Sequence, residues 1–230
     1  MKAFLLAAGH GTRLRPLTDS IPKCLVPIRG VPLLQIWMDL CRRNGITEVL
    51  INVHAHSAVV RNVLQQHSSD LKVTVSEEAV LLGSAGTLLA NRHWVGSDPE
   101  FWVFYADVLT TASLRALLDI HHRQNQLATL GLYEVPDPRR CGIVTLDENG
   151  TVLGFVEKPE APSSNLAFCG IMLASRGLFD VIPQQVPADI GFHVLPKLCG
   201  QMSAYRLSDY LVDIGTPENF TLAQTTWPGF

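Results

Sequence analysis

The sequence predicts an α/β fold in which helices flank a mixed, mostly parallel sheet. In the first half of the chain, apolar segments of strand length alternate with segments of helical periodicity. Residues 101–105 (FWVFY) form a continuous apolar run, which is typical of a strand buried on both faces. The second half has shorter strand-like segments separated by turn signals, so we expect it to be more antiparallel.

The elements of the first half follow a β-α-β-α rhythm. Residues 1–8 (MKAFLLAA) predict a strand that ends in a glycine loop. The helical spacing of Leu33, Ile36 and Leu40 predicts a helix that Gly45 ends. Further strands are predicted at 48–53, 71–75, 101–105 and 127–133, and helices at 59–64, 84–91 and 114–121. Such alternation favours parallel strands joined by crossover helices.

Residues 142–146 and 152–156 open the second half as two short strands joined by Asp147-Glu148-Asn149-Gly150, a hairpin signal. A strand at 168–173, a helix around Leu178 and a strand at 210–214 follow. Thr216 is a candidate N-cap for a last helix, with Pro217 in its first turn.

Composition excludes several classes of protein. The net charge of −3 and the lack of long charge runs argue against a nucleic-acid-binding protein. No stretch of about 18 apolar residues occurs, so no membrane span is expected, and residues 1–8 are too short for a signal peptide. The five cysteines are odd in number and lack C-x-x-C spacing, which indicates reduced thiols and a cytoplasmic protein.

The segment after the first strand has the composition of a phosphate-binding loop. Gly9 and Gly11 let backbone N–H groups approach an anion closely. Arg13 offers a planar fork for phosphate oxygens, and Lys23 offers a compact point charge. The third glycine of the dinucleotide fingerprint is absent because position 14 is Leu, and no G-K-[ST] loop occurs. An NAD-dependent oxidoreductase is therefore disfavoured.

The longer string GHGTRLRPLTDSIPKCLVP resembles the N-terminal signature of the sugar-1-phosphate nucleotidyltransferases, also called nucleotide-sugar pyrophosphorylases. The resemblance runs from Met1 to about Ala223 and is to members like the mannose-1-phosphate guanylyltransferases without a C-terminal β-helix. It implies a Rossmann-like nucleotide-diphospho-sugar transferase fold. We expect a single domain over residues 1–230, with a nucleotide-binding half at about 1–135 and a sugar-binding half at about 136–230.

Two carboxylates match the positions that hold Mg²⁺ in the resembling family. Asp107 follows the strand at 101–105, and Asp213 lies in YLVDIGTPENF, which resembles the family's C-terminal motif. Taken alone, each would be a turn or strand-end aspartate. Ala106 stands where the family usually has glycine. Mg²⁺ prefers oxygen ligands and keeps several waters, so two carboxylates suit it, provided that the fold brings them together.

Glu157-Lys158-Pro159 matches the family's E-K-P motif. By resemblance, Glu157 takes sugar hydroxyls and Lys158 holds the sugar phosphate, whereas the motif alone could be an exposed charged turn. Gly142 and Phe168 match sugar contacts, and Asn165 lies just before Phe168. The implied sugar-phosphate site comprises Gly142, Glu157, Lys158, Asn165 and Phe168.

Residues 82–88 (LGSAGTL) resemble the family's base-recognition loop, in a form most like guanylyltransferases acting on mannose 1-phosphate or a related sugar. Without the resemblance, they could be an ordinary helix start. The implied nucleotide site comprises Leu6, Ala8, Gly9, Gly11, Thr12, Arg13, Lys23, Gly83, Ser84, Gly86 and Thr87. The implied catalytic residues are Arg13, Lys23, Asp107 and Lys158.

The resemblance implies transfer of a nucleoside monophosphate from an NTP to a sugar 1-phosphate with Mg²⁺, giving an NDP-sugar and pyrophosphate. Uridylyl or thymidylyl transfer is the alternative within this class, and a non-catalytic nucleotide-sugar sensor or regulatory subunit is the alternative outside it. The pairs His54/His56 and His121/His122 lack the further ligands of a zinc site. Whether the chain forms a homo-oligomer is left open.

Overall fold

A computed structural model describes residues 1–9, 11–54, 56–66 and 70–230 of the chain. The chain forms two compact units that are interleaved along the sequence. The first unit comprises Met1–Leu81, Phe104–Ser113 and Asp209–Phe230, and the second comprises Leu82–Val103 and Leu114–Ser208. The functional division into a nucleotide half and a sugar half stays a prediction.

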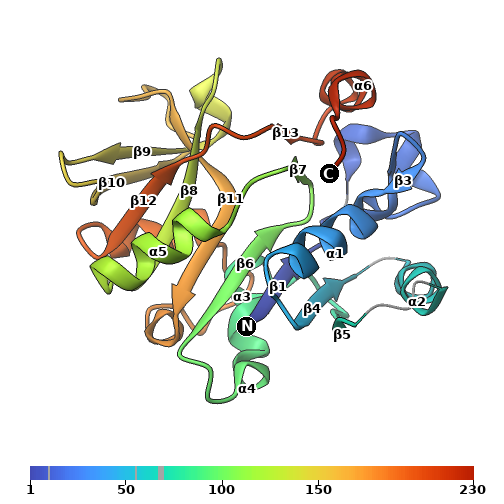
Figure 1. The fold of residues 1–230 in the computed structure, drawn as a ribbon, viewed down its shortest axis with the longest axis horizontal. Coiled ribbons are helices and arrows are strands. Elements are labelled where there is room, and N and C mark those ends of the chain that lie inside the picture. The colour runs from blue at the N-terminus through green and yellow to red at the C-terminus, as the bar shows by residue number, and fades with distance from the viewer. Residues whose placement is uncertain (10, 55, 67–69) are drawn as a thin grey trace. The chain divides into compact units, whose positions relative to one another are not determined.

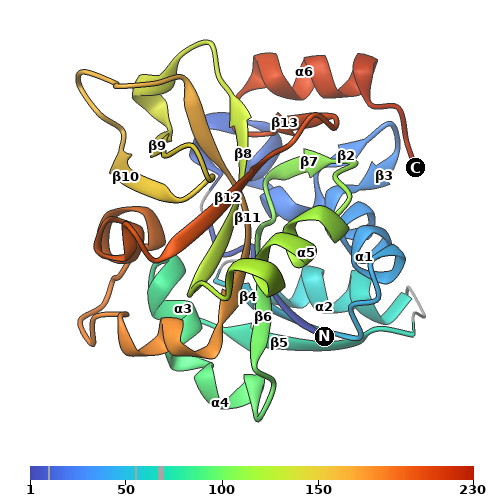
Figure 2. The same ribbon diagram turned by 60° about the vertical axis from the view of Figure 1, so that its left-hand side comes forward.

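Figures 1 and 2 show the elements. The strands are β1 (Lys2–Leu6), β2 (Pro27–Ile28), β3 (Val31–Pro32), β4 (Glu48–Val53), β5 (Lys72–Glu77), β6 (Glu100–Tyr105), β7 (Val108–Thr110), β8 (Ala128–Glu134), β9 (Gly142–Leu146), β10 (Val152–Glu157), β11 (Leu166–Ser175), β12 (Met202–Arg206) and β13 (Leu211–Asp213). The helices are α1 (Leu33–Arg43), α2 (Ser57–Gln66), α3 (Ser84–Ala90), α4 (Arg92–Val95), α5 (Arg115–Gln124) and α6 (Pro217–Thr226).

The first unit is built on parallel strands, as the β-α rhythm predicts. β1 pairs with β4 (Phe4↔Leu50), and β4 pairs with β5 (Leu50↔Thr74), both in parallel (Figure 1). The centres of β1 and β4 are buried because their side chains are apolar on both faces. Trp37 of α1 stacks on Phe104 with ring centroids 4.9 Å apart, which fixes the helix against this core.

The second unit is more antiparallel, also as expected. β9 and β10 form the predicted hairpin, and β11 pairs with β8 in the antiparallel sense. β12, which the sequence did not reveal, runs parallel to β8 in the register Met202↔Ala128. α5 packs against β8 and β12 (Figure 2). The α/β class is confirmed, and helices accompany strands in each unit.

Several local predictions need correction. The expected helix around Leu178 is a 3-10 turn over Arg176–Asp180, consistent with the poor helix propensity of Gly177. The last strand is shorter than 210–214, because only Leu211–Asp213 pairs with β7. The cap of α6 is confirmed, since the Thr216 hydroxyl accepts a hydrogen bond from Asn219 N–H, with Pro217 in the first turn. Among the helices of the described residues, none is both long and apolar enough to span a membrane.

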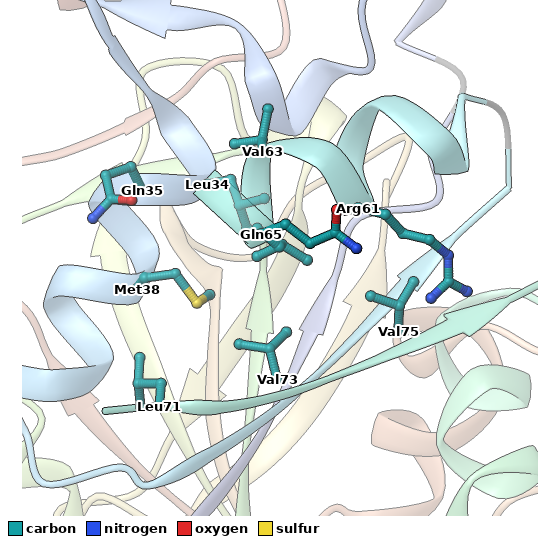
Figure 3. Close-up of a pocket in the computed structure, with 10 residues that line it drawn as sticks. Leu34, Gln35, Met38, Arg61, Val63, Gln65, Leu71, Val73 and Val75 are labelled. Atoms are coloured by element: carbon teal, nitrogen blue, oxygen red, sulfur yellow. The ribbon is translucent and has the colours of Figure 1, made fainter. Parts of the chain in front are cut away.

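A hollow of about 390 Å³ in the first unit lies between α1, α2 and β5. Figure 3 shows Val73 of β5 on the side of Met38 and Val75 nearer to Arg61 of α2. Its charged lining residue, Arg61, is already bound to Glu77. None of the predicted site residues lines this hollow, so the chemistry must be sought at the carboxyl ends of the strands.

Candidate active site

The glycine loop follows β1 and folds back on itself. Gly11 adopts the left-handed conformation (φ 63°, ψ 19°), and its carbonyl accepts hydrogen bonds from Leu14 N–H (2.9 Å) and the Thr18 hydroxyl (2.7 Å). A Cβ at position 11 would lie 3.1 Å from Thr18 Cγ2 and 3.4 Å from Lys23 Cβ. Glycine is therefore required for both the conformation and the close approach. Position 10 lies outside the described residues.

Lys23 lies between the two predicted metal carboxylates. Its ammonium donates to Asp107 Oδ2 at 2.7 Å, and its Nζ lies 3.9 Å from Asp213 Oδ1. The pairing of β7 with β13 places Asp213 opposite Val108, and Ile214 N–H donates to the Asp107 carbonyl at 2.8 Å. Two carboxylates about a hundred residues apart in the chain therefore meet through a short antiparallel ladder within one unit.

Arg13 reaches the same group. A Cβ on Gly215 would lie 2.7 Å from Asp213 Oδ1 and 3.0 Å from Arg13 Nη2, so both side chains converge over this glycine. We did not single out Gly215 from the sequence, although it is the glycine of the D-I-G-T-P-E segment. Four of the six predicted charged residues, Arg13, Lys23, Asp107 and Asp213, thus gather in the first unit.

The donor set is suited to a hard divalent cation. Two carboxylates lie side by side, with side chains 35% and 41% exposed, and a positive ammonium already stands between them. Mg²⁺ commonly takes one or two carboxylates and fills its other positions with water and substrate phosphates. No group of three or more metal-ligating side chains occurs in the described part of the chain. A cation here would therefore depend on water or substrate oxygens for its remaining ligands.

A cavity of about 150 Å³ adjoins the glycine loop and is lined by Ala7, Ala8 and Gly9. His54, at the end of β4, lines it too. Cys24 also contributes, but burial raises the pKa of its thiol to about 12, so it stays protonated and is no nucleophile. The cavity therefore combines the small residues of the glycine loop with polar and charged side chains, among them Arg15 and Asp19.

In the second unit, the predicted base loop is held by residues 188–190, which were not predicted from the sequence. Ala85 and Gly86 N–H groups donate to the Ala188 carbonyl at 2.9 and 3.1 Å. The Ser84 hydroxyl donates to Asp189 Oδ2 (2.8 Å) and accepts from Ile190 N–H (2.7 Å). Asp189 also caps the following turn through Gly191 and Phe192 N–H, an aspartate-cap signal that could have revealed it.

Thr87 is also bound within the base loop, because its hydroxyl donates to the Gly83 carbonyl at 3.1 Å. The Ser84 hydroxyl is bound to Asp189 and Ile190, so both hydroxyls of the loop already have protein partners. Recognition of a base at this loop would therefore depend mainly on backbone groups, as small residues permit.

Glu157 lies against Gly142, with Lys158 beside it. A Cβ on Gly142 would lie 2.6 Å from Glu157 Oε2, and one on Gly191 would lie 2.9 Å from Glu157 Cδ. Lys158 Nζ lies 3.8 Å from Glu157 Oε1. Burial raises the pKa of Glu157, Lys158 lowers it and Asp189 raises it. Two glycines thus leave room for a partly buried carboxylate beside an exposed ammonium.

The remaining sugar-site residues differ in their placement. Phe168 packs edge-on to Phe155 at 6.5 Å, and Phe155 in turn contacts the space over Gly142. Asn165 is exposed before β11, and its carbonyl accepts from Val135 N–H at 3.0 Å. The structure thus links Phe168 to the Gly142 region and anchors Asn165 through its main chain.

The histidines have structural explanations. His121 is buried, with Nδ1 3.0 Å from the Thr129 hydroxyl and Nε2 3.1 Å from the Ser175 hydroxyl. Burial lowers its pKa, Glu100 raises it and His122 lowers it. His54 Nδ1 lies 2.7 Å from the Glu78 carbonyl. Because a carbonyl only accepts hydrogen bonds, this nitrogen carries the proton.

Comparison with known proteins identifies the family of the chain. The model of the nucleotidyl transferase family matches residues 2–227. The chain therefore belongs to the nucleotidyl transferase family, and the resemblance seen in the sequence is confirmed.

Among similar proteins is mannose-1-phosphate guanylyltransferase 1 of Arabidopsis thaliana, 32% identical over 227 residues, which cover 96% of this chain and 63% of that protein. The chain thus spans less than two thirds of this relative's length. UTP-bound UGPase from Acinetobacter baumannii superposes with a TM-score of 0.85 at 22% identity, covering 98% of this chain and 92% of that one. HddC from Yersinia pseudotuberculosis complexed with GMP-PN gives a TM-score of 0.83 at 23% identity, covering 98% and 99%. At these identities the structural likeness establishes the fold.

Proposed function

We propose that this chain transfers a nucleoside monophosphate from an NTP to a sugar 1-phosphate, giving an NDP-sugar and pyrophosphate. The observation that carries the proposal is the meeting of Lys23, Asp107 and Asp213 beside the glycine loop that bears Arg13. Membership of the nucleotidyl transferase family supports the proposal. The basic side chains suit a polyphosphate, and the two carboxylates suit a divalent cation.

In the proposed reaction, a phosphate oxygen of the sugar 1-phosphate attacks the α-phosphorus of the NTP. The bond from the α-phosphorus to the bridging oxygen breaks, and pyrophosphate departs with that electron pair. Both reactants are anions, so positioning and charge neutralisation are the main needs, and no protein nucleophile is required. Arg13 stabilises the departing pyrophosphate, Lys23 the nucleotide phosphates, and Lys158 the attacking phosphate.

Asp107 and Asp213 would hold Mg²⁺. When bound, the ion would neutralise phosphate charge and polarise the phosphoryl group. The adjacent carboxylates support this assignment, because the ammonium of Lys23 already occupies a place where positive charge is favoured.

Glu157 would accept hydrogen bonds from sugar hydroxyls, with Gly142, Asn165 and Phe168 beside the sugar. Burial raises the pKa of Glu157, and in its ionised form the carboxylate can accept two such bonds. The loop of Gly83, Ser84, Gly86 and Thr87 would read the base, and Leu6, Ala8, Gly9, Gly11 and Thr12 would face the nucleotide.

Guanylyl transfer to mannose 1-phosphate is the substrate pair that we favour, from the G-S-A-G loop and from the name of the Arabidopsis relative. Uridylyl or thymidylyl transfer is the alternative, supported by the UTP-bound structural neighbour. The five free thiols support a cytoplasmic location.

Pyrophosphate release from a grid of four NTPs against several sugar 1-phosphates, with Mg²⁺, tests the proposal. We expect turnover with one base and one narrow set of sugars, and none when the sugar phosphate is omitted. Thermal stabilisation by NTP without pyrophosphate release in any pair would instead indicate a non-catalytic nucleotide-sugar sensor.

A further inference from the structure

Two buried polar side chains connect the ends of the three parallel strands in the first unit. Asn52 lies in β4 and Glu78 directly follows β5, and each is only 5% exposed. Asn52 Oδ1 accepts a hydrogen bond from Ala7 N–H at 2.7 Å, and Asn52 Nδ2 donates to Glu78 Oε1 at 2.8 Å. Ala7 directly follows β1 and begins the glycine loop.

The direction of these hydrogen bonds is determined by chemistry. A backbone N–H can only donate and a carboxylate can only accept, so the oxygen of the Asn52 amide must face Ala7 and its nitrogen must face Glu78. Glu78 is itself held by its main chain, because its N–H donates to the Val53 carbonyl at 2.8 Å and its carbonyl accepts from His54 Nδ1 at 2.7 Å.

The cost of this arrangement suggests a role beyond packing. The neighbouring β4 residues Leu50, Ile51 and Val53 are buried and apolar, and an apolar residue at position 52 would avoid the cost of burying an amide and a carboxylate. The pair lies at the carboxyl ends of parallel strands, where ligands bind in open α/β sheets. Ala7 and His54 also line the 150 Å³ cavity at the glycine loop.

We infer that Asn52 and Glu78 are positioning residues that hold Ala7 and thereby aim the backbone N–H groups of the glycine loop at the phosphates of the NTP. This inference rests on the proposed function. If the pair serves nucleotide binding, substitutions in it should weaken NTP binding and leave the affinity for the sugar phosphate unchanged. A general contribution to folding would affect both substrates.

A reversal of the hydrogen-bond polarity tests the inference. Asn52→Asp alone places two carboxylates against each other, so the Ala7 contact is disturbed and the KM for NTP should rise about tenfold or more, an order typical of one lost buried polar contact. The KM for the sugar 1-phosphate should stay within about twofold, inside the scatter of independent sites. Glu78→Gln alone keeps an acceptor for Asn52 and should have a small effect.

The double variant Asn52→Asp/Glu78→Gln should restore NTP binding. The introduced carboxylate can accept from Ala7 N–H, as Asn52 does, and from the introduced amide, so the hydrogen bond between positions 52 and 78 forms again with its polarity reversed. Glu77→Gln is the matched control, because Glu77 precedes Glu78 in the chain but is exposed and bound to Arg61. It should leave both KM values unchanged.

Calorimetric titration with NTP and the unfolding midpoint complete the experiment. Loss of thermal stability with an unchanged KM for NTP, or a double variant no better than Asn52→Asp, would overturn the inference. If Asn52→Asp does not fold, Glu78→Ala carries the same test. A wild-type protein that binds NTP but releases no pyrophosphate refutes the proposed function instead, and NTP affinity then still reports on the positioning pair.

Discussion

Lys23 shows at the scale of one residue how this site handles charge. Its side chain is only 10% exposed, yet its ammonium is not stranded, because Asp107 and Asp213 stand on either side of it. One ammonium and two carboxylates give the group a formal charge of −1. Without the ammonium, the two carboxylates would repel each other, and both would repel the phosphates of an NTP.

We predict that Lys23→Met lowers turnover about 10²–10³-fold, the cost typical of losing one preorganised electrostatic donor. The comparison variant is Lys72→Met, which breaks the exposed pair of Lys72 with Glu48. Steady-state pyrophosphate release from both purified variants provides the measurement. Near-normal turnover of Lys23→Met would remove Lys23 from the catalytic group.

At the scale of an element, the start of α3 depends on Gly83. Its conformation (φ 77°, ψ 163°) belongs to a region that glycine alone adopts readily. A Cβ there would lie 2.8 Å from the Ala188 carbonyl carbon, and the Ala188 oxygen already accepts from Ala85 and Gly86 N–H. One glycine thus allows the 188–189 segment to close over the base loop.

Gly83→Ala should therefore separate α3 from that segment. Conformational strain alone costs about 1–3 kcal/mol, and the backbone clash adds to it, so we expect a lower unfolding midpoint and weakened NTP binding. Gly200→Ala provides the comparison, since Gly200 also has positive φ (83°) but open space around its Cβ position. Equal NTP affinity in the two variants would show that the close approach is unimportant.

At the scale of the whole molecule, stability should depend on pH through His121. Burial, the largest influence, lowers the pKa of this imidazole in the folded state, with Glu100 raising it and His122 lowering it. The unfolded chain therefore binds the proton more readily. The free energy of unfolding is undiminished above the unfolded pKa of about 6.5 and falls as pH drops below it.

We predict that His121→Gln flattens the loss of stability between pH 8 and pH 5, a loss limited to about 1.4 kcal/mol per pH unit for one proton. The exposed His93 offers the control: it is not among the groups that shift the pKa of His121, so His93→Gln should keep the wild-type slope. Denaturant unfolding at several pH values gives the free energies. Glu157 has the opposite effect on stability. Its pKa is raised in the folded state, chiefly by burial, so the folded chain binds this proton more readily than the unfolded chain and gains stability as pH falls. A slope in His121→Gln as steep as the wild type would refute the role of His121.

The sequence by itself determined the local features of this protein. Apolar runs and helical spacing specified β1, β4, β6 and α1, the D-E-N-G turn specified the β9–β10 hairpin, and Thr216 with Pro217 specified the start of α6. The long glycine-loop signature identified the family, because it is a contiguous string. Such features follow from neighbours in the chain, where propensity and capping act.

Only the tertiary structure decided the rest. β12 is short and depends on its parallel partner β8, more than 70 residues away, so local patterning does not mark it. The approach of Asp107 to Asp213, the convergence of Arg13 over Gly215, and the Asn52–Glu78 contact all join distant parts of the chain. Hydrogen bonds and ion pairs between distant segments form only where strand pairing brings their atoms within bonding distance. Composition and residue spacing do not specify those distances.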